Sequence, residues 1–260
     1  MVRREKTNYI IQSVSHALDV LEQFSGEGDE LGVTELSKRL KLHKNNVFRL
    51  LATLESRGYI EQNKATENYR LGVCCLRLGQ RFLNQMGLLR QARAVMKQLA
   101  KSSRETAFIA VMRNDTVVPL DAVEADQAVR LVSRIGDFLP LHCTAAGKIH
   151  LAAADAEFVA SLPESLHKFT EKTIVDRQAL THQLKKIAEN GYALDLGEHI
   201  EDVRAVAVPV RDYTRAVIGS LAISGPAYRM SQERIEKELV PLMIKAGREF
   251  SIRLGFDVEQ

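Results

Sequence analysis

Residues 33–58, VTELSKRLKLHKNNVFRLLATLESRG, decide the fold of the N-terminal part of this 260-residue chain. Apolar residues recur at helical spacing in two blocks, which are Val33, Leu36 and Leu40, then Val47, Leu50, Leu51 and Leu54. This spacing gives each block one apolar face to bury. The stretch therefore predicts two short amphipathic helices around a tight polar turn, the arrangement of a helix-turn-helix that binds DNA.

The start and outer face of the second predicted helix carry side chains suited to the major groove. They are Lys44, Asn45, Asn46 and Arg49. Asn can form two hydrogen bonds with adenine, and Arg or Lys can bind guanine or a phosphate. Because the N-terminal end of a recognition helix enters the major groove, we expect these four residues to contact DNA.

The charges in this stretch point the same way. Between Glu35 and Glu55 every charged residue is positive, namely Lys38, Arg39, Lys41, Lys44 and Arg49. Basic runs are often only solvated helix faces. Here the run coincides with the helix-turn-helix pattern, so Lys38 joins the predicted DNA contacts.

A β-hairpin is predicted directly after the second helix. Two short runs, GYIEQ at 58–62 and YRL at 69–71, flank a polar tip at 63–68, which is typical of a hairpin. In a winged helix such a wing lies along the phosphate backbone and positions the protein without specifying sequence. The predicted phosphate contacts are Lys64, Asn68 and Arg70.

Composition sets the outer bounds. The chain is long enough for two domains, and 45% hydrophobic with 27% charged residues is ordinary for a soluble globular protein. No apolar run approaches the roughly 20 residues needed to span a bilayer. The N-terminus, MVRREKTNYI, is charged and has no signal-peptide core. We expect a cytoplasmic protein.

No catalytic or metal-binding constellation is evident in the sequence. The three cysteines, Cys74, Cys75 and Cys143, have no CxxC spacing. The neighbours His142 and Cys143 suggest a catalytic pair at first, but HExxH, GxSxG and GxxxxGK[ST] motifs are all absent. We expect no enzyme activity, no catalytic residue, no metal and no cofactor.

Helices are predicted before and after the winged-helix segment. Residues 10–24 place Ile10, Val14 and Leu18, with Ala17 and Leu21, on one face, as the first helix of a three-helix core. Residues 71–103 have helical composition almost throughout, with a bend near Gly79 or Gly87. Such a segment connects domains and often presents an apolar stripe to a second copy.

The rest of the chain predicts an α+β domain. Strands are expected at 105–113, 116–123, 128–133, 203–210 and 216–224, and helices at 144–154, 176–190 and 231–254. The expected fold is an antiparallel sheet with flanking helices, a sensor-like domain.

Four further motifs follow the winged-helix segment in a fixed order. They are GDFLPLHCTAAGK at 136–148, GYA at 191–193, VAVPV at 206–210 and ISGP at 223–226. With these motifs, residues 9 to 255 resemble the IclR family of bacterial transcriptional regulators. The resemblance implies a winged helix-turn-helix at 9–72, a linker helix at 73–89 and a GAF-like effector-binding domain at 90–256. It also implies dimers, commonly paired into tetramers, that bind palindromic operators near a promoter.

The signature at 136–148 offers a physical reason for a ligand site. Pro140 ends a loop, Thr144 can cap a helix, and the small residues Ala145, Ala146 and Gly147 leave the first-turn amides uncovered. A helix N-terminus with bare amides suits a carboxylate. The small residues equally allow close packing of the helix on the sheet, and the resemblance favours effector contact. Lys148 could also bind an acidic ligand. It lies in the first turn of the helix, however, where its positive charge opposes the helix dipole, so an ion pair with an acidic residue elsewhere in the chain is the alternative.

Carried over by motif position, the effector site also includes Asp195, Ala205, Ala222 and Ser224. This sequence departs from frequent family patterns at Ala205, where many members have cysteine, and at Ala222, where some have serine. Cys143 stands where alanine is common. The loss of polar groups at Ala205 and Ala222 predicts a pocket for a more apolar or bulkier ligand.

The predicted function is sequence-specific regulation of transcription under control of a small organic acid, with a repressor favoured over an activator. Under the repressor hypothesis, effector binding changes the spacing of the two winged heads relative to their half-sites. Under the activator hypothesis, the bound form is competent, or the protein contacts RNA polymerase. The rival class is a sensor whose helix-turn-helix binds protein, or an enzyme that acts on a small acid.

Overall fold

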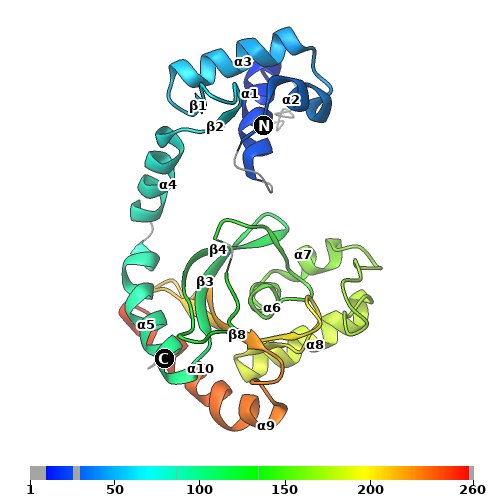
Figure 1. The fold of residues 1–260 in the computed structure, drawn as a ribbon. Helices are drawn as coiled ribbons and strands as arrows, with labels where there is room; N and C mark the ends of the chain where they lie inside the picture. The colour runs from blue at the N-terminus through cyan, green and yellow to red at the C-terminus, as the bar shows by residue number, and fades with distance from the viewer. Residues whose placement is uncertain (1–9, 26–29, 86, 134, 258–260) are drawn as a thin grey trace. The chain divides into compact units, whose positions relative to one another are not determined.

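The computed structural model describes residues 10–25, 30–85, 87–133 and 135–257 (Figure 1). The chain divides into two compact units, Met1–Gln85 and Met86–Gln260, and each is described by itself. Within the described residues, none of the helices combines the length and the apolar composition needed to cross a membrane.

The first unit is a winged helix. It contains α1 (Gln12–Glu22), a short 3-10 turn (Gln23–Ser25), α2 (Val33–Leu40), α3 (Lys44–Ser56), β1 (Ile60–Gln62), β2 (Tyr69–Leu71) and α4 (Val73–Gln85). The helices pack around the fully buried side chains of Val20, Leu36, Val47 and Leu51. Between α2 and α3, Lys41 adopts a left-handed conformation with φ of 55°, which makes the turn tight. The helix-turn-helix and the hairpin are therefore formed by the predicted residues.

The predicted apolar face of α1 is only partly correct. Ala17 and Leu21 pack on the core together with Val20, which the periodicity did not select. Ile10, Val14 and Leu18 are instead 66%, 54% and 53% exposed. Apolar residues lie on more than one side of this short helix, and only one side can face α3. The sequence alone does not say which side that is.

The predicted long helix after the wing is two helices. Helix α4 runs through Gly79 without a break and ends at Gln85, and α5 (Gly87–Ser103) belongs to the second unit. Of the two positions predicted for a bend, Gly79 is therefore wrong, whereas Gly87 is the first residue of α5. A Cβ at Gly79 would meet no atom within 4 Å, so this glycine marks no close approach.

The second unit is built on a six-stranded antiparallel sheet of order β5-β4-β3-β8-β7-β6. The strands are β3 (Thr106–Arg113), β4 (Thr116–Val123), β5 (Leu139–Pro140), β6 (Ala193–Asp195), β7 (Val203–Arg211) and β8 (Val217–Pro226). Figure 1 shows α5 and α10 (Val240–Arg253) on one side of the sheet, with α6 (Ala145–Ala152) and α8 (Arg177–Asn190) on the other. A short α7 (Ala156–Ser161) follows α6, and α9 (Gln232–Arg234) with a π-helical turn (Ile235–Leu239) precedes α10. This is the predicted α+β fold.

Alternation along the strands explains the two layers. Successive strand residues point to opposite faces. On β7, Val206 and Val208 face the layer of α5 and α10, whereas Ala205 and Ala207 face the layer of α6 and α8. Small side chains on that second face let α6 lie close to the sheet.

The predicted strand at 128–133 is wrong. Residues 124–133 have no regular secondary structure, and the free edge of β4 pairs with β5 instead. Side chains of the sheet hold this segment in place. The Thr106 hydroxyl donates to the Leu131 carbonyl over 2.6 Å, and the Arg229 guanidinium donates to the Val129 carbonyl over 2.7 Å. Its β-branched composition therefore serves a loop that lies against the sheet rather than a strand within it.

Candidate DNA-binding surface and ligand pocket

The recognition helix α3 packs on the core of the first unit with one side and exposes the other side to solvent. Val47 and Leu51 are buried in the core of the first unit. At the N-terminus, the His43 ring accepts a hydrogen bond from the Asn45 amide over 3.4 Å. The predicted contacts Lys44, Asn45, Asn46 and Arg49 are all exposed. Among the described residues, the side chains of these four form no hydrogen bond or ion pair, and each is available to a ligand.

The wing residues are less uniform than predicted. Lys64 is exposed at the tip, and Lys38 is exposed on α2. Arg70 already pairs with Glu61 across the hairpin, at 2.7 Å between Nε and Oε1. Asn68 is half-buried, and its side-chain oxygen would lie 2.8 Å from a Cβ at Gly32. Of the three predicted wing contacts, Lys64 is therefore the one with an unpaired side chain that faces solvent.

One exposed residue on α3 has no counterpart in the prediction. The Phe48 side chain is 56% exposed, although the residues on either side of it in sequence are Val47 and Arg49. It lies three residues after Asn45 and four after Lys44, so it shares their side of the helix. The sequence did contain a signal for this exposed residue, because Phe48 is apolar but lies outside the i, i+3, i+4 series of Val47, Leu50 and Leu51.

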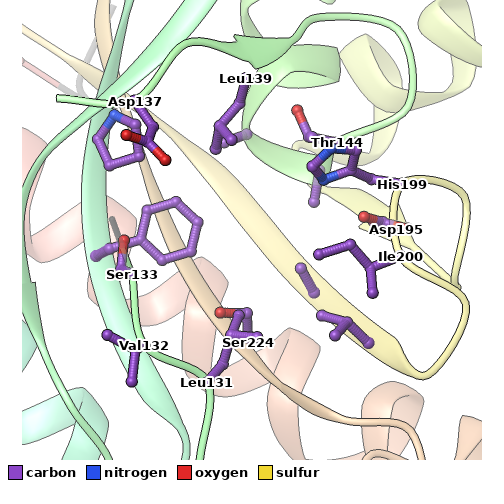
Figure 2. A pocket seen from close by; sticks show the side chains of 16 residues that line it. Leu131, Val132, Ser133, Asp137, Leu139, Thr144, Asp195, His199, Ile200 and Ser224 are labelled. Atoms are coloured by element: carbon purple, nitrogen blue, oxygen red, sulfur yellow. The ribbon is translucent and has the colours of Figure 1, made fainter. Parts of the chain in front are cut away.

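The second unit contains a cavity of about 490 Å³ beside the N-terminus of α6. Figure 2 shows Leu131, Val132 and Ser133 on one side of it and Asp195, His199 and Ile200 on the other. Six of the eight predicted effector residues line this cavity: Thr144, Ala145, Ala146, Asp195, Ala205 and Ser224.

Gly147 and Ala222 do not line the cavity. A Cβ at Gly147 would lie 2.4 Å from the Leu141 carbonyl oxygen, so this glycine permits a close backbone approach. Ala222 is fully buried on β8, paired with Phe108 and Ala207 on the neighbouring strands. For these two positions, close packing accounts for the small residue.

The N-terminus of α6 leaves two amides available. Thr144 caps the helix: its hydroxyl accepts from the Gly147 amide over 3.1 Å and donates to the Pro140 carbonyl over 2.7 Å. The amides of Ala145 and Ala146 have no partner among the described residues, and both residues line the cavity. An anion there would gain two backbone donors at the positive end of the helix dipole.

Asp195 and Ser224 provide the side-chain polar groups deep in the cavity. The Asp195 carboxylate is buried, and its Oδ1 accepts from the amides of Gly197 and Glu198 over 3.0 Å and 2.7 Å. Burial raises the pKa of this carboxyl group above its usual range. The Ser224 hydroxyl is buried without a hydrogen-bond partner in the described part of the chain. Buried polar groups are normally satisfied, and in the cavity a water molecule or a polar group of a bound ligand would pair with this hydroxyl.

Lys148 has a protein partner. Its side chain is fully buried, and Nζ lies 2.5 Å from Oε1 of Glu198. The predicted partner acid is thereby identified, and Lys148 does not line the cavity. The pair links α6 to the β6–β7 connection, which begins directly after Asp195 at the end of β6.

His199 is the functional candidate that sequence reasoning missed. It lines the cavity, and its ring packs edge-on against Phe169 at 5.1 Å between centroids. Its ring nitrogens form no hydrogen bond within the described residues. Burial, followed by the nearby His142, lowers the pKa of His199. A lone histidine gives no sequence signal, because its position depends on how the β6–β7 connection folds back over the cavity.

His142 and Cys143 do not form a nucleophile and base. The Cys143 thiol is fully buried, and burial together with Asp195 raises its pKa to about 12. A thiol of this kind stays protonated and inert near neutral pH. The His142 Nε2 lies 2.9 Å from the His167 carbonyl oxygen, and neither residue 142 nor 143 lines the cavity.

Comparison with known proteins identifies the same architecture. A family model described as Bacterial transcriptional regulator IclR C-terminal matches residues 80–252, and the IclR helix-turn-helix domain model matches residues 13–64. The chain is 36% identical over 248 residues to the HTH-type transcriptional regulator KdgR of Escherichia coli (strain K12), which covers 94% of each chain. It is 30% identical over 249 residues to the Acetate operon repressor of Salmonella typhimurium, over 94% of this chain and 90% of the relative.

Solved structures share the fold over nearly the whole chain. An IclR transcriptional regulator from Alicyclobacillus acidocaldarius aligns with a TM-score of 0.81 at 26% identity, over 94% of this chain and 99% of the other. An IclR homolog of Microbacterium hydrocarbonoxydans, solved in complex with 4-hydroxybenzoate, aligns with a TM-score of 0.81 at 24% identity and the same coverage.

A winged helix-turn-helix joined to an α+β domain with a pocket defines the class of DNA-binding regulators that carry a separate sensor domain. Within that class, the chain belongs to the IclR family of bacterial transcriptional regulators.

Proposed function

We propose that this protein is a repressor that binds a palindromic operator as a homodimer or tetramer and releases it when a small organic acid binds the second unit. The observation that carries the proposal is the pair of amides at Ala145 and Ala146, which line a cavity together with the Ser224 hydroxyl and, like it, have no partner among the described residues. Cavities with a few convergent polar groups and apolar walls are the usual form of small-molecule sites.

The cavity favours a monocarboxylate with an apolar body and a second polar group. The carboxylate would accept hydrogen bonds from the amides of Ala145 and Ala146. The described lining residues include the acids Asp137 and Asp195 and no lysine or arginine, which disfavours a ligand with several negative charges. A hydroxyl group on the ligand would pair with Ser224 or Asp195. In agreement, a solved homolog of the same fold holds 4-hydroxybenzoate.

The first unit supplies the DNA contacts and a surface for a second copy. The proposed contacts are those predicted from the sequence, with Lys64 as the main phosphate contact of the wing. The exposed apolar residues Ile10, Val14 and Leu18 on α1, and Val73 and Leu76 on α4, are the proposed dimer contacts. The proposed domains of the chain are a winged helix-turn-helix at 9–72, a linker helix at 73–89 and an effector-binding domain at 90–256. A dimer is required because operator half-sites lie about one helical turn, or a multiple, apart.

Selection of random duplex DNA on the purified protein, followed by salt and acid titrations of the best sequence, tests the proposal. We expect an enriched pseudo-palindrome whose affinity falls steeply with salt, by about 0.9 in log–log slope for each phosphate contact. Pyruvate and 4-hydroxybenzoate are suitable first acids. Release of the DNA by an acid supports the proposed mechanism, whereas tighter binding in the presence of the acid would contradict it.

The Arg49→Ala variant separates the two sites. We expect its operator affinity to fall about tenfold or more, since a good base contact is worth roughly 1–3 kcal/mol. Acid binding should be unchanged, because Arg49 belongs to the first unit and the cavity to the second. The oligomeric state should also be unchanged, because Arg49 lies on α3 and is not among the proposed dimer contacts. Unchanged operator affinity would refute its role.

A further inference from the structure

The aromatic ring of Phe48 is placed among DNA-contacting candidates rather than in a core. Its side chain is 56% exposed on α3, although its helical neighbours Val47 and Leu51 are fully buried in the core. Asn45, three residues before it, and Arg49, directly after it, are exposed polar residues with no side-chain partner among those described. An exposed ring in a polar surface has no structural role in the isolated unit.

We propose that Phe48 is a specificity-determining residue that contacts the 5-methyl group of a thymine in the major groove. The inference rests on the proposed function and deepens it, because it names the base that this side chain recognises.

The chemistry of the major groove supports this assignment. The thymine methyl is the apolar group among the base edges, and Phe is one of the side chains that contact it. Asn45 and Arg49 are suited to adenine and guanine through hydrogen bonds, which Phe48 cannot form. The three residues lie in the first two turns of α3, and this end of a recognition helix enters the groove. One short segment would thus combine polar and apolar readout.

The main alternative is that Phe48 contacts a second copy of the chain. The other large apolar side chains exposed in the described part of the first unit are Ile10, Ile11, Val14 and Leu18 at α1, and Leu71, Val73, Leu76 and Leu78 at β2 and α4. None of these is on α3. The apolar residues suited to a dimer interface therefore lie on other elements, and Phe48 lies within the basic surface.

Replacement of thymine by deoxyuridine tests the contact directly, since it removes only the methyl group. Full-length protein is used to select an operator from random duplexes, and each thymine of the selected sequence is then replaced in turn. For the unaltered protein, we expect one thymine per half-site at which the replacement lowers affinity about two- to fivefold, the effect of one buried methyl group. With Phe48→Ala the replacement should have no effect at that position, and with Phe48→Leu it should have an intermediate effect.

Lys64→Ala is the matched control. Loss of a phosphate contact should weaken binding to all sequences alike, so this variant should keep the full discrimination between thymine and deoxyuridine. The variants are also compared by sedimentation to detect a change in oligomeric state.

Four results would overturn the inference. If every thymine can be replaced without loss in the unaltered protein, the methyl contact does not exist, although the operator still establishes the proposed function. If Phe48→Ala keeps the discrimination between thymine and deoxyuridine, another residue contacts the methyl group. If Phe48→Ala dissociates the oligomer, Phe48 belongs to an interface between copies of the chain. Failure to select any sequence, with or without pyruvate and 4-hydroxybenzoate, would refute the proposed function and this inference with it.

Discussion

His199 shows how one side chain can set the conditions under which the cavity binds an acid. Burial holds its pKa below the ordinary value of about 6.5, so the free protein has a neutral imidazole at neutral pH. A bound carboxylate would favour the charged form and raise that pKa. Proton uptake would then accompany binding.

We therefore predict that affinity for 4-hydroxybenzoate weakens as pH rises from about 5.5 to 8, by up to roughly tenfold per unit between the free and bound pKa values of His199. Titration calorimetry at several pH values measures this change in affinity. His199→Gln should abolish the pH dependence. His167→Gln is the matched control, because its ring also packs edge-on against Phe169, at 4.6 Å, but does not line the cavity.

The surrounding charges could also titrate and must be separated from His199. Asp195 lies in the cavity, Glu198 and Lys148 form an ion pair behind it, and His142 packs against the same Phe169 ring at 5.9 Å. Burial raises the pKa of Asp195, so this carboxyl group would also take up a proton beside an anion. A pH dependence that is lost in Asp195→Asn and kept in His199→Gln would assign the proton to Asp195 and contradict the prediction.

At the scale of elements, the first turn of α6 is positioned against the loop that precedes it by a close approach of the two backbones. Gly147 on α6 has no room for a side chain, because a Cβ would lie 2.4 Å from the carbonyl oxygen and 2.5 Å from the Cα of Leu141. These are backbone atoms and cannot move aside without shifting the loop that precedes the helix. The same loop presents Thr144 and the two free amides to the cavity.

We predict that Gly147→Ala lowers the free energy of unfolding by about 1–3 kcal/mol through overpacking and weakens acid binding. Urea denaturation and the acid titration measure the two effects. Gly79→Ala is the matched control, since it lies in α4 with no atom within 4 Å of the new Cβ. That change should stabilise the helix by up to about 1 kcal/mol. Equal effects of the two substitutions would contradict the packing argument.

At the scale of the whole molecule, the two candidate sites belong to different compact units. The cavity is lined entirely by residues of the second unit, and the proposed DNA contacts lie in the first. A ligand stabilises the unit to which it binds by mass action.

We predict that 4-hydroxybenzoate at 100 times its dissociation constant stabilises the second unit by about 2.7 kcal/mol. Scanning calorimetry of the full chain should show the shift in the transition of that unit and not in the transition of the first. Operator DNA should do the reverse. An acid that shifts the first unit alone would place the effector site elsewhere.

Much of this fold could be predicted because its signals are local. The i, i+3, i+4 spacing of Val47, Leu50 and Leu51 is sufficient for α3, and Thr144 caps α6 as its sequence context suggests. Where local signals were ambiguous, the prediction was wrong. Residues 128–133 have strand composition but form a loop held by side-chain hydrogen bonds, and the exposed side of α1 could not be distinguished from the buried one.

By itself the sequence determined the winged helix, the alternating sheet, the order of the motifs and hence the family, because each depends on neighbours within a few residues along the chain. Tertiary structure alone decided which residues surround the cavity. It brought Glu198 to Lys148, 50 residues apart, and placed His199 beside the N-terminus of α6. Such placements follow from the packing of distant segments against one sheet or one core, and no spacing within the chain encodes them.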